Sequence, residues 1–169
     1  MSDPPGRPEP PSLAALPKRF RNVPYVPARH PRAVAAGDLS AGANCQLYAY
    51  AFLAHHGLYA PPLRSSDLWA DSTATETVAA DDVAPLDLLL FDGGPRSGVD
   101  EGYAAHVAVH LGPDQVLHLC QEVGAPAIWS YADFATRPRY ARLLGAKRCL
   151  DATVPLQGVP RPRPSRGSR

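Results

Sequence analysis

Apolar and polar positions follow two different periods along this chain, a helical one first and a strand-like one after it. Between residues 44 and 58, apolar side chains recur at helical spacing, at Leu47, Ala51, Ala54 and Leu58. Asn44 is a typical N-cap residue, and Gly57 is typical of the position just beyond a helix C-terminus. This segment therefore predicts a helix of about 12 residues. A second, short helix is predicted over Ser65–Ala70.

From about residue 86 onward, the chain carries short apolar runs, several with the period of two that is typical of β-strands. Strands are predicted over residues 86–91, 106–111, 115–120, 127–129 and 140–147, with a helical turn over 131–136. Gly112-Pro113-Asp114 is a turn signal, so the second and third strands are predicted to form a hairpin. Helices followed by an antiparallel meander predict an α+β domain in which N-terminal helices pack on the sheet.

Proline marks the expected ends of this domain. The 169 residues include 20 prolines, of which nine lie before residue 32 and four lie after residue 154. The first 32 and the last 15 residues each carry a net charge of +4, which leaves −7 for the middle because the whole chain carries +1. We therefore expect a flexible proline-rich arm over residues 1–24, a folded domain over 25–150 and a basic Pro/Arg-rich tail over 151–169.

Composition also excludes several classes of protein. No apolar run approaches the roughly 18–20 residues of a membrane helix, and no apolar segment follows the N-terminus as in a secretory signal. We therefore expect no membrane span and, from the absence of a signal peptide, a cytoplasmic location unless another export route is used. Three cysteines without a CxxC pair argue against a disulfide framework. The domain is acidic, so a nucleic-acid partner is not expected, although the basic arms can contact an acidic partner.

Three residues of the expected domain have the chemistry of a thiol hydrolase. Cys45 would occupy the first helical turn, where free backbone N–H groups and the helix dipole lower the pKa of a thiol. A thiolate nucleophile needs a base and a group that orients the base, and His106 and His118 lie on the two strands of the hairpin. Side chains alternate faces along a strand, so both imidazoles share a face only if the turn has three residues or a bulge, which we predict.

Other interpretations of the same residues remain open. The cysteine and histidines can be structural, which gives a non-catalytic protein-binding module. A zinc site at His106, His110, His118 and Cys120 is disfavoured, because His106 and His110 lie about 13 Å apart along a strand. Cys120 is an alternative nucleophile on the face of His118, but it lacks a helix N-terminus.

The order and spacing of five segments resemble the NlpC-type cell-wall cysteine peptidases, which are minimal papain-like thiol hydrolases. The resemblance covers roughly residues 40–148. The segments are Cys45…Gly57, Leu63-Arg64-Ser65-Ser66-Asp67, Pro85–Phe91, His106–Gly112 and Val116-Leu117-His118. The resemblance implies a papain-like fold, a bacterial source and hydrolysis of peptide or amide bonds in cell-wall-type peptides.

The resemblance also implies a role for each site residue. Cys45 would be the nucleophile, its backbone N–H would help to form the oxyanion site, His106 would be the general base and acid, and His118 would orient His106. The family places substrate-cleft residues where this chain has Arg64, Ser65 and Asp67, and we add Trp69 as a candidate cleft wall. The expected enzyme is a cysteine peptidase or amidase that forms a Cys45 thioester and needs no metal or other cofactor.

Overall fold

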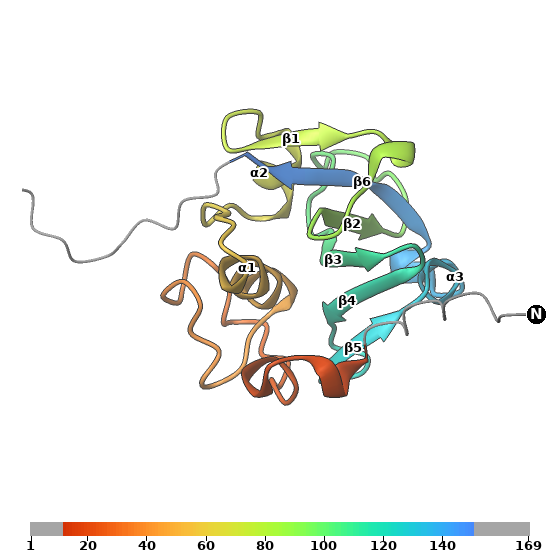
Figure 1. Ribbon diagram of the computed structural model, residues 1–169. Helices are drawn as coiled ribbons and strands as arrows, with labels where there is room; N and C mark the ends of the chain where they lie inside the picture. The colour runs from red at the N-terminus through yellow and green to blue at the C-terminus, as the bar shows by residue number, and fades with distance from the viewer. Residues whose placement is uncertain (1–11, 151–169) are drawn as a thin grey trace, which may run out of the picture.

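The computed structural model describes residues 12–150, which form an antiparallel six-stranded sheet with helices on both faces (Figure 1). The strands are β1 (Thr75–Val78), β2 (Leu88–Asp92), β3 (His106–Gly112), β4 (Gln115–Leu119), β5 (Pro126–Trp129) and β6 (Arg142–Cys149). The helices are α1 (Cys45–His55), α2 (Ser65–Ala70) and α3 (Tyr131–Ala135). The short 3-10 helices are η1 (Leu13–Ala15), η2 (Lys18–Phe20), η3 (Ala80–Asp82) and η4 (Pro138–Tyr140).

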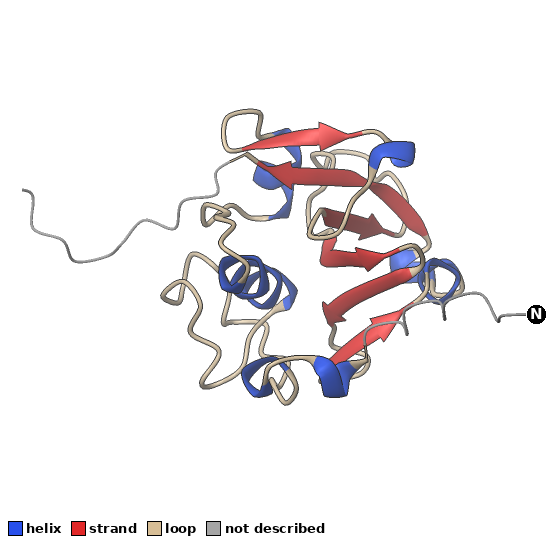
Figure 2. Ribbon diagram, viewed as in Figure 1, coloured by secondary structure: helices blue, strands red, loops and turns tan. Residues whose placement is uncertain are grey.

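The strand order is β1-β6-β2-β3-β4-β5, and all neighbours pair antiparallel. Strands β2 to β5 form the predicted meander, and β6 returns to lie between β2 and β1 (Figure 2). The α+β architecture predicted from the sequence is therefore confirmed. Strand β1 was not predicted, because its sequence TETV has no apolar alternation and only its two end residues are buried.

Helix α1 begins and ends where the sequence predicts. The Asn44 side chain accepts a hydrogen bond from the Leu47 N–H at 2.9 Å, and Gly57 follows the helix with a φ of +78°. The helix is buried on all sides from Gln46 to Leu53, however, rather than along one stripe. A helix that is apolar all round needs cover on the side away from the sheet.

The N-terminal segment supplies that cover, which corrects the predicted domain boundary. We expected residues 1–24 to form a flexible arm, but Leu16, Phe20 and Val23 are buried in the core. The Tyr48 hydroxyl donates to the Phe20 carbonyl at 2.7 Å, which ties this segment to α1. Prolines give the segment an extended path with short turns, and its apolar residues still reach the core. Residues 1–11 and 151–169 of the predicted arms lie outside the described residues.

Helix α2 is held to the sheet by a buried lysine. Lys147 on β6 donates from Nζ to the carbonyls of Trp69 at 3.3 Å and Asp71 at 2.6 Å. The Trp69 ring lies against Gly145, where a Cβ atom would come within 2.6 Å of the ring. The missing side chain at Gly145 therefore lets α2 approach β6 closely.

The two faces of the sheet carry different residues. Val107, Val109, Leu117 and Leu119 belong to the core that surrounds α1. Alternate positions on the same strands belong to a second core, with Phe134 of α3 and Tyr140 of η4. His106 alternates with Val107, so its side chain belongs to the second face.

Candidate active site

Cys45 lies where two neighbouring strands separate. It is the first residue of α1 and is partly exposed, and its sulfur faces the backbone N–H groups of Val107 and Gln46. Strands β3 and β4 are paired next to their turn, from the pair Gly112–Gln115 to the pair Val109–Leu117, and not beyond it. The first residues of β3 are therefore paired with β2 alone, which leaves the N–H of Val107 available to the thiol.

The two histidines meet on one face of the hairpin, as the predicted bulge requires. The register between β3 and β4 shifts between His110 and Gly112, which confirms the bulge. Nε2 of His106 and Nδ1 of His118 lie 2.9 Å apart, within hydrogen-bond distance. The His106 side chain thus has one ring nitrogen, Nδ1, that is not used by His118.

Burial keeps both imidazoles neutral. It lowers the pKa of His106 to about 3, and the guanidinium of Arg139 adds to this shift. Burial also lowers the pKa of His118 to about 2, with further contributions from His106 and Arg137. At neutral pH both side chains are therefore unprotonated bases.

The pKa of the Cys45 thiol is shifted in the direction opposite to the one predicted from the sequence. We predicted a lowered pKa for Cys45, but burial raises it by more than the surrounding groups lower it. The opposing groups are the N–H groups of Val107 and Gln46 and the charge of Arg64. At neutral pH Cys45 therefore rests as a thiol and His106 as a neutral imidazole, rather than as a thiolate and an imidazolium.

Tyr25 and Tyr140 also lie at this site, and neither was placed there from the sequence. Tyr25 forms an isolated parallel bridge with Ala43, and its pKa is raised by burial and by Cys45. The Tyr140 ring centroid lies 4.8 Å from that of His106. Both tyrosines reach the site through contacts with residues distant in sequence, Tyr25 through its bridge to Ala43 and Tyr140 through its ring contact with His106. No local pattern in the sequence marks them.

The predicted substrate-binding residues are placed unevenly around the thiol. Arg64 lies close enough for its charge to lower the pKa of Cys45, whereas Ser65 is buried at the start of α2. Asp67 is exposed on α2. The Trp69 ring packs against Gly145, and its Cβ would meet a side chain at Gly102. Their binding roles stay predictions.

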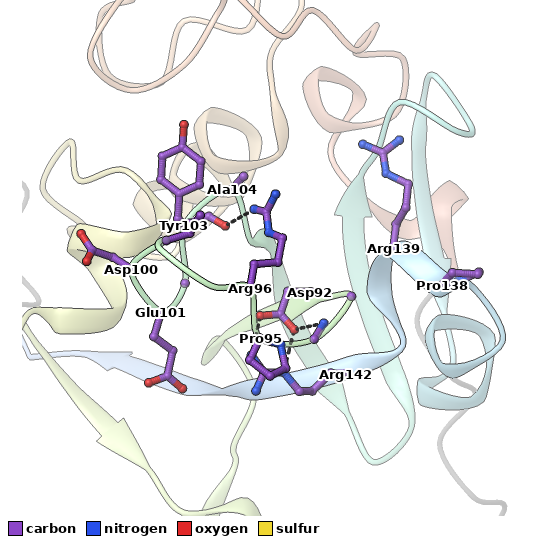
Figure 3. Close-up of a pocket in the computed structure, with 14 residues that line it drawn as sticks. Asp92, Pro95, Arg96, Asp100, Glu101, Tyr103, Ala104, Pro138, Arg139 and Arg142 are labelled. Carbon is purple, nitrogen blue, oxygen red and sulfur yellow. Dashed lines mark hydrogen bonds and ion pairs between the residues drawn. The ribbon is translucent and has the colours of Figure 1, made fainter.

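A cavity of about 730 Å³ opens where the segment between β2 and β3 faces η4 (Figure 3). The segment between β2 and β3 forms one wall, and η4 and the start of β6 form the other. Ala104, two residues before His106, and Arg139 both line it. The lining residues fall within 92–96, 99–104, 138–139 and 142.

Two alternative sites were considered from the sequence, a zinc site and a nucleophile at Cys120. Within residues 12–150, no group of three or more His, Cys, Asp or Glu residues is arranged to hold a metal ion. Cys120 is buried just after β4 and is not part of a helix. No helix among the described residues is both long and apolar enough to cross a membrane.

Comparison with known proteins identifies the fold. No family model matches the chain, and no curated protein matches it. One similar solved structure, from Staphylococcus aureus subsp. aureus Mu50, is described as similar to a lipoprotein of the NLP/P60 family. It is 18% identical, with a TM-score of 0.52, and the match covers 78% of this chain and 38% of that one.

A second similar structure is an NlpC/P60 family protein from Bacillus cereus ATCC 10987. It is 22% identical, with a TM-score of 0.52, and the match covers 78% of this chain and 37% of that one. The chain therefore spans less than two-fifths of the length of either neighbour. At these identities the likeness shows the fold, which is the papain-like α+β fold of NlpC/P60 proteins.

Proposed function

We propose that this protein is a cysteine hydrolase that cleaves a peptide or amide bond through a thioester on Cys45, with cell-wall-type peptides as the substrate class. The observation that carries the proposal is the pair of His106 and His118, with Nε2 and Nδ1 2.9 Å apart. His106 directly precedes Val107, whose backbone N–H faces the Cys45 sulfur. Contact of the Cys45 sulfur with Val107, the residue after His106, supports placing the nucleophile near this pair.

The proposed mechanism requires one direction of the hydrogen bond between the histidines, with His106 as donor and His118 as acceptor. A neutral His106 that donates from Nε2 to Nδ1 of His118 has a free lone pair on Nδ1. That lone pair can accept the Cys45 proton. In this arrangement His118 carries its own proton on Nε2, a buried atom with no hydrogen-bond partner among the described residues. The Trp129 ring packs against the His118 ring, with 4.1 Å between centroids.

Acyl transfer to Cys45 follows from these roles. The Cys45 sulfur attacks the amide carbon as His106 takes the thiol proton, and an S–C bond forms. The C–N bond then breaks, and His106 returns the proton to the leaving amine. Water, deprotonated by His106, attacks the thioester, releases the carboxylic acid and restores the thiol.

The first turn of α1 supplies groups for the developing oxyanion. Cys45 is the first helical residue, so its backbone N–H has no partner within the helix. A donor at this position stabilises negative charge on the carbonyl oxygen during attack. Because the resting thiol is protonated, the proton transfer to His106 accompanies attack rather than preceding it.

A non-catalytic binding module on the same fold is the second candidate. It is favoured by the raised pKa of the Cys45 thiol, because a thiol that stays protonated is a weaker nucleophile. The two candidates differ in what happens at Cys45 when an electrophile is supplied.

Labelling the full chain with a thiol-directed electrophile, followed by peptide mapping, separates them. The hydrolase predicts modification at Cys45 that slows at least tenfold in His106→Ala. Cys120→Ala is the matched control, because it removes a buried thiol at the end of β4 and leaves Cys45 in place. An inert Cys45, or a reactivity unchanged by His106→Ala, supports the binding module.

A further inference from the structure

We propose that Trp129 and Arg137 are positioning residues, which cover His118 and hold it as the hydrogen-bond acceptor of His106. This role rests on the proposed hydrolase function and deepens it, because it explains what keeps the base ready to take the Cys45 proton. The packing around the His118 ring, on the face of the sheet that carries Phe134, is the observation behind it.

Three rings surround the His118 imidazole. The ring centroids of Trp129, Phe134 and His106 lie 4.1, 4.7 and 5.1 Å from that of His118. Phe134 and His106 are themselves buried, whereas Trp129 is partly exposed. The Trp129 side chain therefore lies between His118 and solvent, and the His118 residue is only 1% exposed.

The register of β5 places Trp129 on the His118 side of the sheet. Ala127 lies directly opposite His118, and Trp129, two residues further along β5, shares the same face. A large side chain at such a diagonal position reaches the ring on the neighbouring strand. Ile128 points the other way and packs against the core around α1. Adjacent residues of β5 therefore provide a test position and a matched control.

Arg137 stabilises the position of the Trp129 ring. Its guanidinium lies over that ring, with 3.8 Å from Cζ to the ring centroid, and a cation is attracted to the face of an indole. The same guanidinium donates to Glu122 at 3.0 Å and to the Asp133 carbonyl at 2.6 Å. These two acceptors fix the guanidinium, and the guanidinium in turn holds the tryptophan against His118.

The charge on His118 decides whether His106 can act as a base. A neutral His118 accepts at Nδ1 from Nε2 of His106, which leaves a lone pair on Nδ1 of His106. A protonated His118 carries an N–H on both ring nitrogens and can only donate. His106 would then accept at Nε2 and hold its own proton on Nδ1, so it could not take the proton of Cys45.

The surroundings of His118 oppose its protonation. Burial is the largest cause that lowers its pKa, to about 2, and the charges of His106 and Arg137 lower it further. No carboxylate within residues 12–150 shifts this pKa toward the charged form. Access of water to the ring should therefore raise the pKa toward the ordinary value of 6.5. The titratable and charged groups on the surrounding elements are His106 and His110 on β3, Cys120 and Glu122 between β4 and β5, Tyr131 and Asp133 on α3, Arg137 after α3, and Arg139 and Tyr140 on η4.

NMR titration of the histidine rings in the full chain, from pH 8 to pH 5, measures the charge on His118 without reference to activity. The His118 signal is the one that His118→Gln lacks. We expect His118 to stay neutral over this range in the wild type and to titrate at about pH 5 to 6 in Trp129→Ala, because water then reaches the ring. Trp129→Thr should behave in the same way, and threonine suits an edge strand such as β5. Trp129→Phe keeps an aromatic cover and should stay neutral.

The rate at which p-nitrophenyl acetate acylates Cys45 is the second readout. In the wild type this rate should stay nearly constant from pH 7 to pH 5, since both imidazoles remain neutral. In Trp129→Ala it should fall about five- to tenfold over the same range, and in Arg137→Gln about twofold, because a larger share of His118 is protonated. Trp129→Phe should follow the wild type. Ile128→Ala is the matched control and should also follow it, because its side chain lies on the other face of β5.

The outcomes separate this positioning role from the function on which it rests. If Cys45 is not acylated in the wild type, the proposed function fails, and the positioning role in it fails as well. If Cys45 is acylated but His118 stays neutral in both Trp129→Ala and Trp129→Thr, the positioning role is wrong and the hydrolase stands. A loss of rate toward pH 5 that Ile128→Ala reproduces is a general effect of destabilising β5, and it also overturns the role. Titration of His118 in the two tryptophan variants, rescued in Trp129→Phe, supports it.

Discussion

The two faces of the sheet are built from different chemistry, although they share the same strands. The face toward α1 is apolar and aliphatic, with Val107, Val109, Leu117 and Leu119 against the helix. The opposite face is aromatic and carries the imidazoles, with Phe134 within 4.7 Å of the His118 ring centroid. One face stabilises the fold, and the other holds two neutral bases away from water.

Cys45 links these faces. It belongs to the helix on the aliphatic face, but its sulfur lies at the opening between β3 and β4, next to the residue that follows His106. A strand reverses faces at every residue, so neighbouring residues on β3 serve the two faces separately. Substitutions at neighbouring positions of β3 should therefore have different effects. Those on the aromatic face should lower activity, and those on the aliphatic face should lower stability.

The largest expected difference is in activity, between substitution of His106 and substitution of its neighbour Val107. His106→Ala removes the base and should lower kcat/KM at least a thousandfold, whereas Val107→Ala should leave it within about threefold. Val107→Ala should instead lower the free energy of unfolding by about 2 kcal/mol, because it removes buried methyl groups next to α1. The measurements are hydrolysis of cell-wall stem peptides and denaturant unfolding. Equal losses of activity in both variants would contradict a division of labour between the faces.

The buried imidazoles should also make stability depend on pH. Their pKa values in the folded protein, about 3 and about 2, lie below the value of 6.5 for an unperturbed histidine. Between these limits the unfolded chain binds more protons, so the free energy of unfolding falls as the pH is lowered. From pH 7 to pH 5 the fall should be about 2 kcal/mol for each imidazole.

Denaturant unfolding of wild type and His118→Gln at both pH values measures this dependence. The variant should lose about half of the pH effect of the histidine pair. Carboxylates with lowered pKa values, such as Asp92, titrate below this window and do not contribute. A pH dependence that is identical in both proteins would show that His118 is not held neutral by burial.

The next prediction concerns the stability contributed by an aliphatic residue on the face toward α1. Leu117 is fully buried, and Leu117→Ala should lower the free energy of unfolding by about 3 kcal/mol through the cavity that it creates. Thermal or denaturant unfolding measures it. Labelling of Cys45 at temperatures where the variant stays folded should be unchanged. A loss of labelling in the folded variant would mean that this face also shapes the site.

His118 should matter less than His106. His118→Ala removes the partner of His106 Nε2 and should lower kcat about 10- to 100-fold, with KM little changed, because only the orientation of the base is lost. His118→Asn keeps an acceptor near the same position and should recover part of the rate. A rate in His118→Asn no better than in His118→Ala would argue against an orienting hydrogen bond.

The smallest effect concerns the helix that carries the thiol. Asn44→Ala removes the acceptor of the Leu47 N–H and should lower the free energy of unfolding by about 1 kcal/mol. The change should also slow labelling of Cys45 modestly, because the first turn of α1 frays. Asn44→Ser is the control, since serine is also a good N-cap. Equal stability of the two variants would mean that the cap does not hold this turn.

Local patterns in the sequence predict much of this molecule. Asn44 and Gly57 mark the ends of α1, and the spacing of His106 and His118 requires the bulge that the structure contains. These features depend on residues near one another in the chain. Turn chemistry and strand alternation are sufficient to place them.

Long-range contacts account for what the sequence does not predict. Phe20 is buried only because it packs on α1, and no local pattern distinguishes it within a proline-rich stretch. Tyr25 reaches Cys45 by pairing with Ala43. The raised pKa of Cys45 arises from burial by other segments, which outweighs the local effect of the helix terminus.

Trapping an acyl-enzyme tests whether Cys45 is the nucleophile. The full chain is incubated with p-nitrophenyl acetate, quenched in acid and mapped by mass spectrometry, alongside Cys45→Ala and Cys120→Ala. If Cys45 is the nucleophile, an acetyl group appears on the peptide that contains Cys45. It is retained in Cys120→Ala, absent in Cys45→Ala and lost over time as water hydrolyses the thioester. Acetylation that persists in Cys45→Ala, or none at all in the wild type, would contradict this assignment.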